Sequence, residues 1–276
     1  MHRRASLPAR INILGEHTDY AGGLALPFAV DLRLTLDARS QKNGYDGEST
    51  VVDLWRAAGG WPARLSVESQ IPIGVGMSSS AALCLAVVLC VNGFMNPQEA
   101  CIEAQRIEHE VLKTPCGLLD QMAMMYAKEG CATLIDFTDS STKSVELPSS
   151  WIFKLVDSGI HRKLSQTYHG SVDQNVRTAH VESENSRVRT CLSAPASQLG
   201  LLLNESHASL QKLGVSLPNL DEQVLKLQQT DGVYGARMMG GGYGGMILIL
   251  VENAQVLPEY PVYSPSQGSI LEEFFE

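Results

Sequence analysis

Two glycines and three serines lie close together in the segment Pro72–Ala82, which reads PIGVGMSSSAA. Gly74 and Gly76 let the main chain approach a ligand closely, because neither has a Cβ atom. The serines open an apolar stretch typical of a buried helix, so hydroxyl and unpaired N–H groups converge at its N-terminus. This arrangement predicts an anion site suited to a triphosphate. A glycine turn with serine N-caps is the alternative, and no Gly-Lys-Ser/Thr follows, so the segment is not a Walker A loop.

A second polar segment, Ala9–Gly23, places three side chains that bind hydroxyl groups within four residues. Glu16, His17 and Asp19 follow a short apolar strand and supply a dense set of hydrogen-bond acceptors and donors. Taken alone, this stretch favours a solvated polar turn over a sugar site. Arg10 lies on the strand itself, where a charge needs a partner.

Two acidic residues further along could serve phosphoryl transfer. Glu108 lies in an amphipathic helix and Asp120 follows a Cys-Gly turn. Ser80 and Glu108 could supply oxygen ligands to a divalent cation whose other ligands are phosphate oxygens. Asp120 beside Arg10 could accept a hydroxyl proton. In isolation, each acid is more often a surface residue or a helix cap.

The segment Met239–Gly245 contains five glycines in six positions, at 240, 241, 242, 244 and 245. Such a loop runs close against a ligand or another stretch of backbone. A tight turn between packed elements is an equally good interpretation.

Mixed elements must position these segments. Short apolar and alternating runs predict strands, and longer apolar or amphipathic runs predict helices. The segment Gln41–Gly60 is weakly patterned, so we expect a loop or hairpin. The expected strands include Arg10–Leu14, Leu24–Asp37, Leu65–Val67, Ala132–Phe137, Phe153–Val156 and Met246–Val251. The expected helices are Ser79–Asn92, Asn96–Leu112, Leu118–Tyr126, Tyr168–Leu192, Ser197–Leu210 and Leu220–Gln229. The mixture is α+β, and a change of texture near Ser140–Trp151 is the best candidate for a domain boundary.

Composition excludes several classes of function. The chain has 276 residues and a formal net charge of -9, which argues against a nucleic-acid partner, since such binding relies on Lys and Arg. The six cysteines include no CxxC pair, as expected for a reduced, cytoplasmic protein. No signal peptide follows the basic N-terminus, and no apolar run is long enough for a membrane span.

Together these segments resemble the GHMP kinase family, and its galactokinase branch most closely. The stretch ARINILGEHTDYAGG resembles the galactokinase signature almost residue for residue, and Pro72–Ala82 is similar to the ATP loop of the family. Cys116–Gln121 is similar to the segment with the catalytic aspartate, and Gly240–Gly245 to the third glycine-rich motif. Two weaker similarities lie at Asn204–His207 and Tyr234–Arg237. The resemblance runs from residue 9 to residue 251.

This resemblance implies two α+β domains, at 1–150 and 151–276, with the active site in the cleft between them. It implies that ATP phosphorylates the C1 hydroxyl of α-D-galactose, with Mg²⁺ held by Ser80 and Glu108. Asp120 would be the base, and Arg10 would pair with it and stabilise the transferring phosphoryl group. The implied sugar-binding residues are Glu16, His17, Thr18, Asp19, Gly117 and Tyr168. The implied ATP-binding residues are Gly74, Val75, Gly76, Met77, Ser78, Ser79 and Ser80.

The chain departs from the family pattern in ways that keep alternatives open. It is shorter between Asn43 and Leu65, between Tyr168 and His180, and after Val251. Another sugar, such as arabinose, galacturonate or N-acetylgalactosamine, is therefore the second hypothesis. A non-catalytic sugar and ATP sensor is the third, although the intact Ser78–Ala82 and Asp120 favour an enzyme. The expected partners are a small sugar and ATP, with the protein a monomer.

Overall fold

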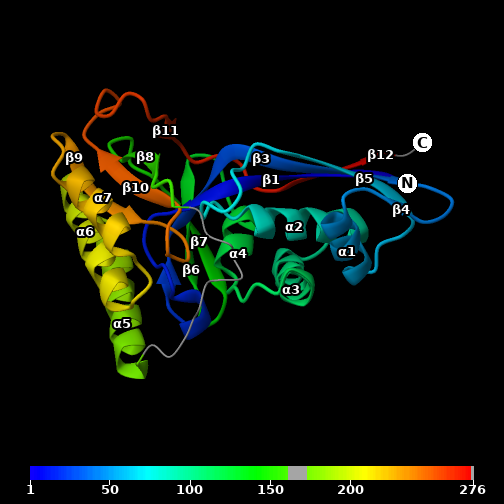
Figure 1. The fold of residues 1–276 in the computed structure, drawn as a ribbon, viewed down its shortest axis with the longest axis horizontal. Coiled ribbons are helices and arrows are strands. Elements are labelled where there is room, and N and C mark those ends of the chain that lie inside the picture. Colours follow the sequence, from blue (N-terminus) through cyan, green and yellow to red (C-terminus); the bar gives the residue numbers. More distant parts are fainter. Residues whose placement is uncertain (161–172, 275–276) are drawn as a thin grey trace.

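The structure, a computed structural model, describes residues 1–160 and 173–274. The molecule is elongated, with one sheet and its helices at one end and a second sheet with three helices at the other (Figure 1). A small third sheet joins the two parts. The expected α+β class is confirmed.

The first sheet has five strands in the order β12-β1-β3-β5-β4. The long strands β1 and β3 pair antiparallel, and a bulge at Pro8 and Ala9 shifts their register. Because β1 ends at Asn12, it delivers the polar segment that follows to the middle of the molecule (Figure 1). The strands are β1 (His2–Asn12), β3 (Pro27–Ser40), β4 (Tyr45–Asp46), β5 (Ala63–Ser69) and β12 (Ile270–Phe274).

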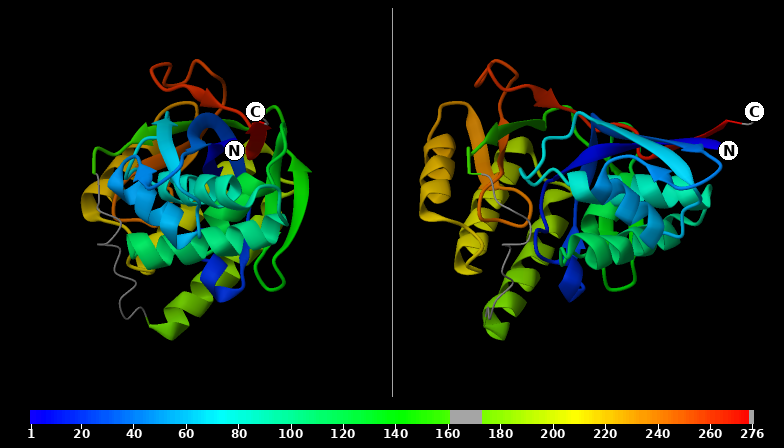
Figure 2. Two further views of the ribbon diagram at one scale, coloured as in Figure 1. Left: turned by 90° about the vertical axis from the view of Figure 1, so that its right-hand side faces the viewer. Right: turned by 45° about the vertical axis from the view of Figure 1, so that its right-hand side comes forward.

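Helices α1 to α4 cover one face of this sheet (Figures 1 and 2). Helix α2 packs against β1 and β3, and its residues from Ala81 to Cys90 are almost all buried, as an apolar pattern on every face requires. Asn96 caps α3 by accepting from the N–H groups of Gln98 and Glu99. The helices are α1 (Ser49–Ala57), α2 (Ser79–Asn92), α3 (Pro97–Ile107) and α4 (Leu119–Met125), and one π-helical turn, Glu108–Leu112, continues α3.

The second sheet has four strands in the order β11-β8-β10-β9, and its three helices lie at the far end of the molecule (Figure 1). Its strands are β8 (Ile152–Asp157), β9 (Val233–Met238), β10 (Met246–Val251) and β11 (Val262–Tyr263), and its helices are α5 (Gln174–Cys191), α6 (Ala196–Lys212) and α7 (Pro218–Gln228). The third sheet consists of β2 (Leu24–Ala25), β6 (Cys131–Asp136) and β7 (Ser141–Glu146).

Most expected elements are present, and one expectation was wrong. The segment Gln41–Gly60 contains helix α1 rather than only a loop or hairpin. Glu48 caps this helix through the N–H of Thr50, and Val51, Leu54 and Trp55 bury one face. The short strands β7, β11 and β12 were not anticipated. The domain division at residue 150 stays a prediction, but β12 pairs with β1 and therefore lies in the N-terminal sheet.

Within the described residues, no single helix is long and apolar enough to cross a membrane. Two successive helical segments, Ser79–Asn92 and Pro97–Leu112, are together long and apolar enough, but a bend of 118° lies between them.

Candidate active site

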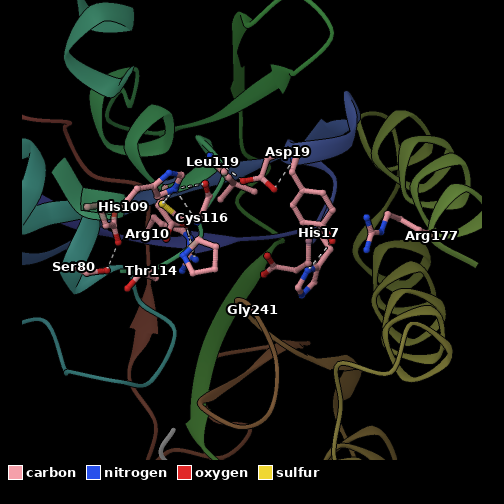
Figure 3. Close-up of a pocket in the computed structure, with 16 residues that line it drawn as sticks. Arg10, His17, Asp19, Ser80, His109, Thr114, Cys116, Leu119, Arg177 and Gly241 are labelled. Atoms are coloured by element: carbon pink, nitrogen blue, oxygen red, sulfur yellow. Dashed lines mark hydrogen bonds and ion pairs between the residues drawn. The ribbon is translucent and has the colours of Figure 1, made fainter. Parts of the chain in front are cut away.

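A cavity of about 350 Å³ lies where the loop after β1, the start of α2, the π-helical turn and the segment before α4 meet (Figure 3). Eight residues that the sequence analysis singled out line it: Arg10, Glu16, His17, Asp19, Ser80, Glu108, Gly117 and Asp120. They come from positions more than a hundred residues apart, so the fold, rather than local sequence, brings them together.

Arg10 and Asp120 form the ion pair that the sequence anticipated. Arg10 Nη2 lies 2.8 Å from Asp120 Oδ1, and Nε donates to the same oxygen at 2.9 Å. Arg10 is buried, and its Nη1 donates to the carbonyl of Gly76 in the glycine-serine loop. The arginine therefore joins the acid on α4 to the loop before α2. Asp120 Oδ2 makes no hydrogen bond or ion pair among residues 1–160 and 173–274 and can accept from a ligand.

The glycine-serine loop contains a serine in an unusual conformation. Ser78 adopts a left-handed conformation with φ of 67°, an uncommon choice for a serine and one found at ligand-binding loops. Its hydroxyl is buried and meets no hydrogen-bond partner within the described residues. The side chains of Val75 and Met77 are buried in the core, so these two residues offer a ligand only their main chain.

The third glycine-rich segment packs directly on this loop. Met246 donates from its N–H to the carbonyl of Val75 at 2.9 Å. A Cβ atom on Gly245 would lie 2.6 Å from the same carbonyl oxygen, so this position requires glycine. The segment lies against another stretch of backbone and also forms the turn between the paired strands β9 and β10, so the structure agrees with both interpretations left open.

Glu108 and Ser80 lie in contact beside the loop. Ser80 Oγ donates to Glu108 Oε1 at 2.7 Å, and Gln121 Nε2 donates to Glu108 Oε2 at 3.0 Å. Glu108 is 2% exposed and lies in the π-helical turn, a distortion frequent at functional sites. Burial, reinforced by the charge of Asp120, raises the pKa of Glu108 to about 7 although Ser80 opposes the shift.

Asp19 and Gly117 meet at the other side of the cavity. Leu119 donates from its N–H to Asp19 Oδ2 at 3.3 Å. A Cβ atom on Gly117 would lie 1.8 Å from that oxygen, so only glycine fits beside Asp19. Burial and the nearby charge of Asp120 raise the pKa of Asp19 to about 6.

Glu16 links the loop after β1 to the second half of the chain. Its Oε1 accepts from the N–H of Gly240 at 2.7 Å and lies 3.3 Å from Arg237 Nη2. Burial alone would raise the pKa of Glu16, but the Arg237 and Arg10 guanidinium groups outweigh it and hold the pKa below its usual value.

Two other predicted sugar-binding residues, His17 and Thr18, differ in whether they reach the cavity. His17 lines the cavity with φ of 58°, and its Nδ1 lies 3.1 Å from the Tyr20 hydroxyl. Thr18 is buried beneath the loop and does not line the cavity, since its hydroxyl donates to the carbonyls of Gly15 and Leu24. Tyr168 lies outside the described residues.

Comparison with known proteins decides the family. Residues 4–39 match the galactokinase galactose-binding signature, 49–128 the GHMP kinase N-terminal domain, and 192–259 the GHMP kinase C-terminal domain. The galactokinase of Roseiflexus sp. is 30% identical over an alignment of 325 residues that covers 90% of this chain and 83% of that protein. The chain belongs to the galactokinase branch of the GHMP kinase family.

Other relatives agree with this assignment to the galactokinases. The galactokinase of Thermotoga maritima is 29% identical, with 90% of this chain and 89% of that protein covered. The structure of Lactococcus lactis galactokinase complexed with galactose superimposes with a TM-score of 0.83, covering 98% of this chain and 95% of that chain at 23% identity. The Methanococcus jannaschii mevalonate kinase gives a TM-score of 0.74 over 97% of this chain and 99% of that chain, at 18% identity. These structural likenesses confirm the GHMP kinase fold. Kinases of this family use ATP.

Several groups in this galactokinase fold were missed by sequence reasoning. The cavity is also lined by His109, Thr114 and Arg177, which the sequence did not single out. Helix α5 supports the loop after β1 through His180, Glu184 and Asn185, which bond to its main chain at Glu16, Gly15 and Leu24. The sequence of α5 shows no clear amphipathic pattern, so it gives no signal for such long-range contacts.

Proposed function

We propose that the chain is an ATP-dependent galactokinase that transfers the γ-phosphate of ATP to the C1 hydroxyl of α-D-galactose. One observation carries the proposal. The segment matching the galactose-binding signature lines one cavity together with Asp120, which pairs with Arg10 of that segment, and with the phosphate-loop serine Ser80. The sugar and the triphosphate would therefore meet at Asp120.

Asp120 would receive the proton of the attacking hydroxyl. Its Oδ1 is held by Arg10, which leaves Oδ2 to accept from the sugar. Arg10 would also oppose the negative charge of the transferring phosphoryl group, because phosphoryl transfer depends on positioning and charge neutralisation. Glu16, His17 and Asp19 would hold the other hydroxyls. Gly74 to Ser80 would enclose the phosphates.

The residues present fit a Mg²⁺ ion bound with the nucleotide. Glu108 is a buried carboxylate with neutral hydrogen-bond donors, and Ser80 lies within 2.7 Å of it. The described residues contain no group of three metal-ligating side chains, which agrees with a cation whose remaining ligands are phosphate oxygens and water. Such an ion would neutralise charge on the phosphates.

The direct test is turnover of a sugar panel with ATP and Mg²⁺, measured as ADP release. We expect galactose to be the best substrate among neutral sugars, and chelation of Mg²⁺ to abolish its turnover. Tight binding of galactose and ATP without product would contradict the proposal and favour a sensor. If the protein turned over arabinose or N-acetylgalactosamine but not galactose, that sugar would take the place of galactose as the substrate.

We further propose that the protein is a cytoplasmic monomer whose partners are small molecules. The net charge of -9 disfavours binding to nucleic acid, and we propose neither a nucleic-acid nor a membrane partner.

A further inference from the structure

A second arginine faces the cavity from helix α5 and has no role in the proposed transfer. Arg177 lies in the first turn of α5 and lines the cavity near His17 and Tyr20. In Figure 3 it lies on the far side of His17 from Ser80 and Thr114. Arg177 therefore marks the end of the cavity that is remote from the phosphate loop.

The guanidinium of Arg177 has no carboxylate partner among residues 1–160 and 173–274. Within the described residues its Nε is buried without a hydrogen-bond acceptor, and its guanidinium carbon lies over the Tyr20 ring, 5.7 Å from the ring centroid. Residues 161–172 contain no Asp or Glu. Arginine is purely a hydrogen-bond donor, so the group that satisfies it must supply acceptor oxygens.

The carboxylates of the cavity are already held by other groups. Asp120 pairs with Arg10 and Glu16 with Arg237. Glu108 accepts from Ser80 and Gln121, and Asp19 accepts from the N–H groups of Leu119 and Tyr20. Arg177 is thus a cation of the described cavity without a matching anion.

The position of Arg177 on its helix also favours an anion. The N-terminus of a helix carries partial positive charge, and a basic residue in the first turn adds to it. No acidic residue lies in the first turn of α5, and the N-cap Asp173 bonds to the N–H of Asn175. An anionic group of a ligand would offset both charges.

We propose that Arg177 forms a carboxylate subsite and that the enzyme also phosphorylates hexuronic acids, sugars that carry a carboxylate at C6. This rests on the proposed function. In a hexopyranose C6 lies outside the ring on C5 and is the carbon farthest from C1, so a sugar with C1 at Asp120 can extend C6 toward the remote end. The planar guanidinium fork matches a carboxylate in a bidentate pair.

The chemistry of the transfer stays the same. The C1 hydroxyl oxygen bonds to the γ-phosphorus, and the bond from that phosphorus to the β,γ-bridging oxygen breaks. ADP leaves with the electron pair, and the hydroxyl proton passes to Asp120.

The test compares kcat/KM for D-galactose and D-galacturonate in the unchanged protein, Arg177→Gln and Arg177→Lys. Arg189→Gln is the matched control, because Arg189 is exposed in the last turn of the same helix. We expect Arg177→Gln to lower kcat/KM for galacturonate about 10- to 100-fold, as for loss of a charge-assisted pair, and to change that for galactose less than about threefold. Arg177→Lys keeps part of the activity, because lysine retains the charge but not the fork.

The outcomes separate this inference from the proposed function. Galactose turnover without binding or turnover of galacturonate overturns the carboxylate subsite alone. Equal losses for both sugars in Arg177→Gln also overturn it. Absence of turnover with either sugar overturns the proposed function as well. If Arg177→Gln fails to fold, competition by galacturonate against galactose in the unchanged protein decides. Competition that weakens with salt supports the pair, and no competition refutes it.

Discussion

At the scale of single residues, the cavity depends on carboxylates that the fold holds in place. Asp120 has Oδ1 fixed by Arg10, while its Oδ2 makes no hydrogen bond within residues 1–160 and 173–274. Asp19 is partly buried, with a pKa raised to about 6 by burial and by Asp120. In the proposed reaction Asp120 would accept a proton, and Asp19 would bind sugar hydroxyls.

Asp120→Asn keeps the shape of the side chain and removes its ability to accept a proton. We expect kcat for galactose to fall about 10²- to 10⁴-fold, the usual contribution of a general base, with a smaller change in KM. Steady-state ADP release measures both. Asp231→Asn, at an exposed position, is the control. A variant with unchanged kcat would remove Asp120 from the mechanism.

Asp19→Asn should stabilise the protein near neutral pH while weakening sugar binding. Because the pKa is raised from 3.8 to about 6, the folded protein binds this proton more tightly than the unfolded chain. The free energy of unfolding therefore falls as the pH rises from about 4 to 6, and the penalty persists above that window. We expect the variant to gain about 2 kcal/mol at pH 7.5 relative to its difference at pH 4.

Chemical denaturation at both pH values measures this difference, with Asp231→Asn as the control for a surface charge. A difference that does not change with pH would show that the Asp19 proton is not linked to folding.

At the scale of elements, turns and helices fix these side chains. The Cys-Gly turn before α4 leaves room for Asp19 because Gly117 has no Cβ. Helix α5 supports the loop after β1 from the other side. Its His180 donates to the carbonyl of Glu16 at 2.9 Å, and its Nδ1 lies 2.8 Å from the Ser209 hydroxyl.

Gly117→Ala would place a methyl group 1.8 Å from the present position of Asp19 Oδ2. Asp19 must then move away from the cavity wall. We expect KM for galactose to rise at least about tenfold, as for a lost hydrogen bond to a charged group, while KM for ATP stays within about twofold. Equal changes in both constants would indicate general damage rather than a local displacement.

His180→Ala would leave the Glu16 carbonyl without its donor. Burial lowers the pKa of His180, so the neutral ring makes both contacts at neutral pH. We expect a loss of about 1–3 kcal/mol in the free energy of unfolding and a higher KM for galactose. Urea denaturation and kinetics test this. His180→Gln, which keeps an amide donor, should recover part of the loss, and no recovery would argue against the hydrogen bond.

At the scale of the whole molecule, the two chain ends meet in one sheet far from α5, α6 and α7 (Figures 1 and 2). Strand β12 pairs with β1, and Arg3 Nε lies 2.7 Å from Glu273. Phe274 stacks on His2 with ring centroids 4.3 Å apart. The C-terminal strand therefore covers an edge of the first sheet without approaching the cavity.

A chain that ends at Ser269 lacks β12 and exposes the edge of β1. We expect Tm to fall by about 4–8 °C, as for a loss of about 2 kcal/mol in a chain of this size, with kcat and both KM values retained. Calorimetry and kinetics measure these. Glu273→Gln, which removes only the ion pair, should lower Tm less. Loss of activity at temperatures where the truncated chain is folded would contradict this division.

Sequence reasoning anticipated the cavity well, because its motifs carry strong local signals. The glycine-serine loop leads into α2, and Arg10 pairs with Asp120 as expected. It failed at α1, a helix of only nine residues that lies between glycines at 44, 47, 59 and 60. It also missed β12 and the contacts of α5, a helix that it did anticipate, because these contacts join residues more than 160 positions apart. Residues this far apart in the sequence are brought together by the fold, so their contacts leave no periodic pattern in the sequence.

The buried Arg237 has a mechanical consequence for the enzyme in motion. From β9 it donates to the carbonyls of Asn12 and Ile13 and lies 3.3 Å from Glu16, while fully excluded from water. Separating β9 from the loop after β1 would leave the buried Arg237 guanidinium without hydrogen-bond partners. That loss costs far more free energy than a rotation of the two halves about this point. Any closure of the two halves over their ligands must therefore pivot here. In hydrogen exchange, the amides of β9 and Asn12 should stay protected while the rims of the cavity respond to ligand.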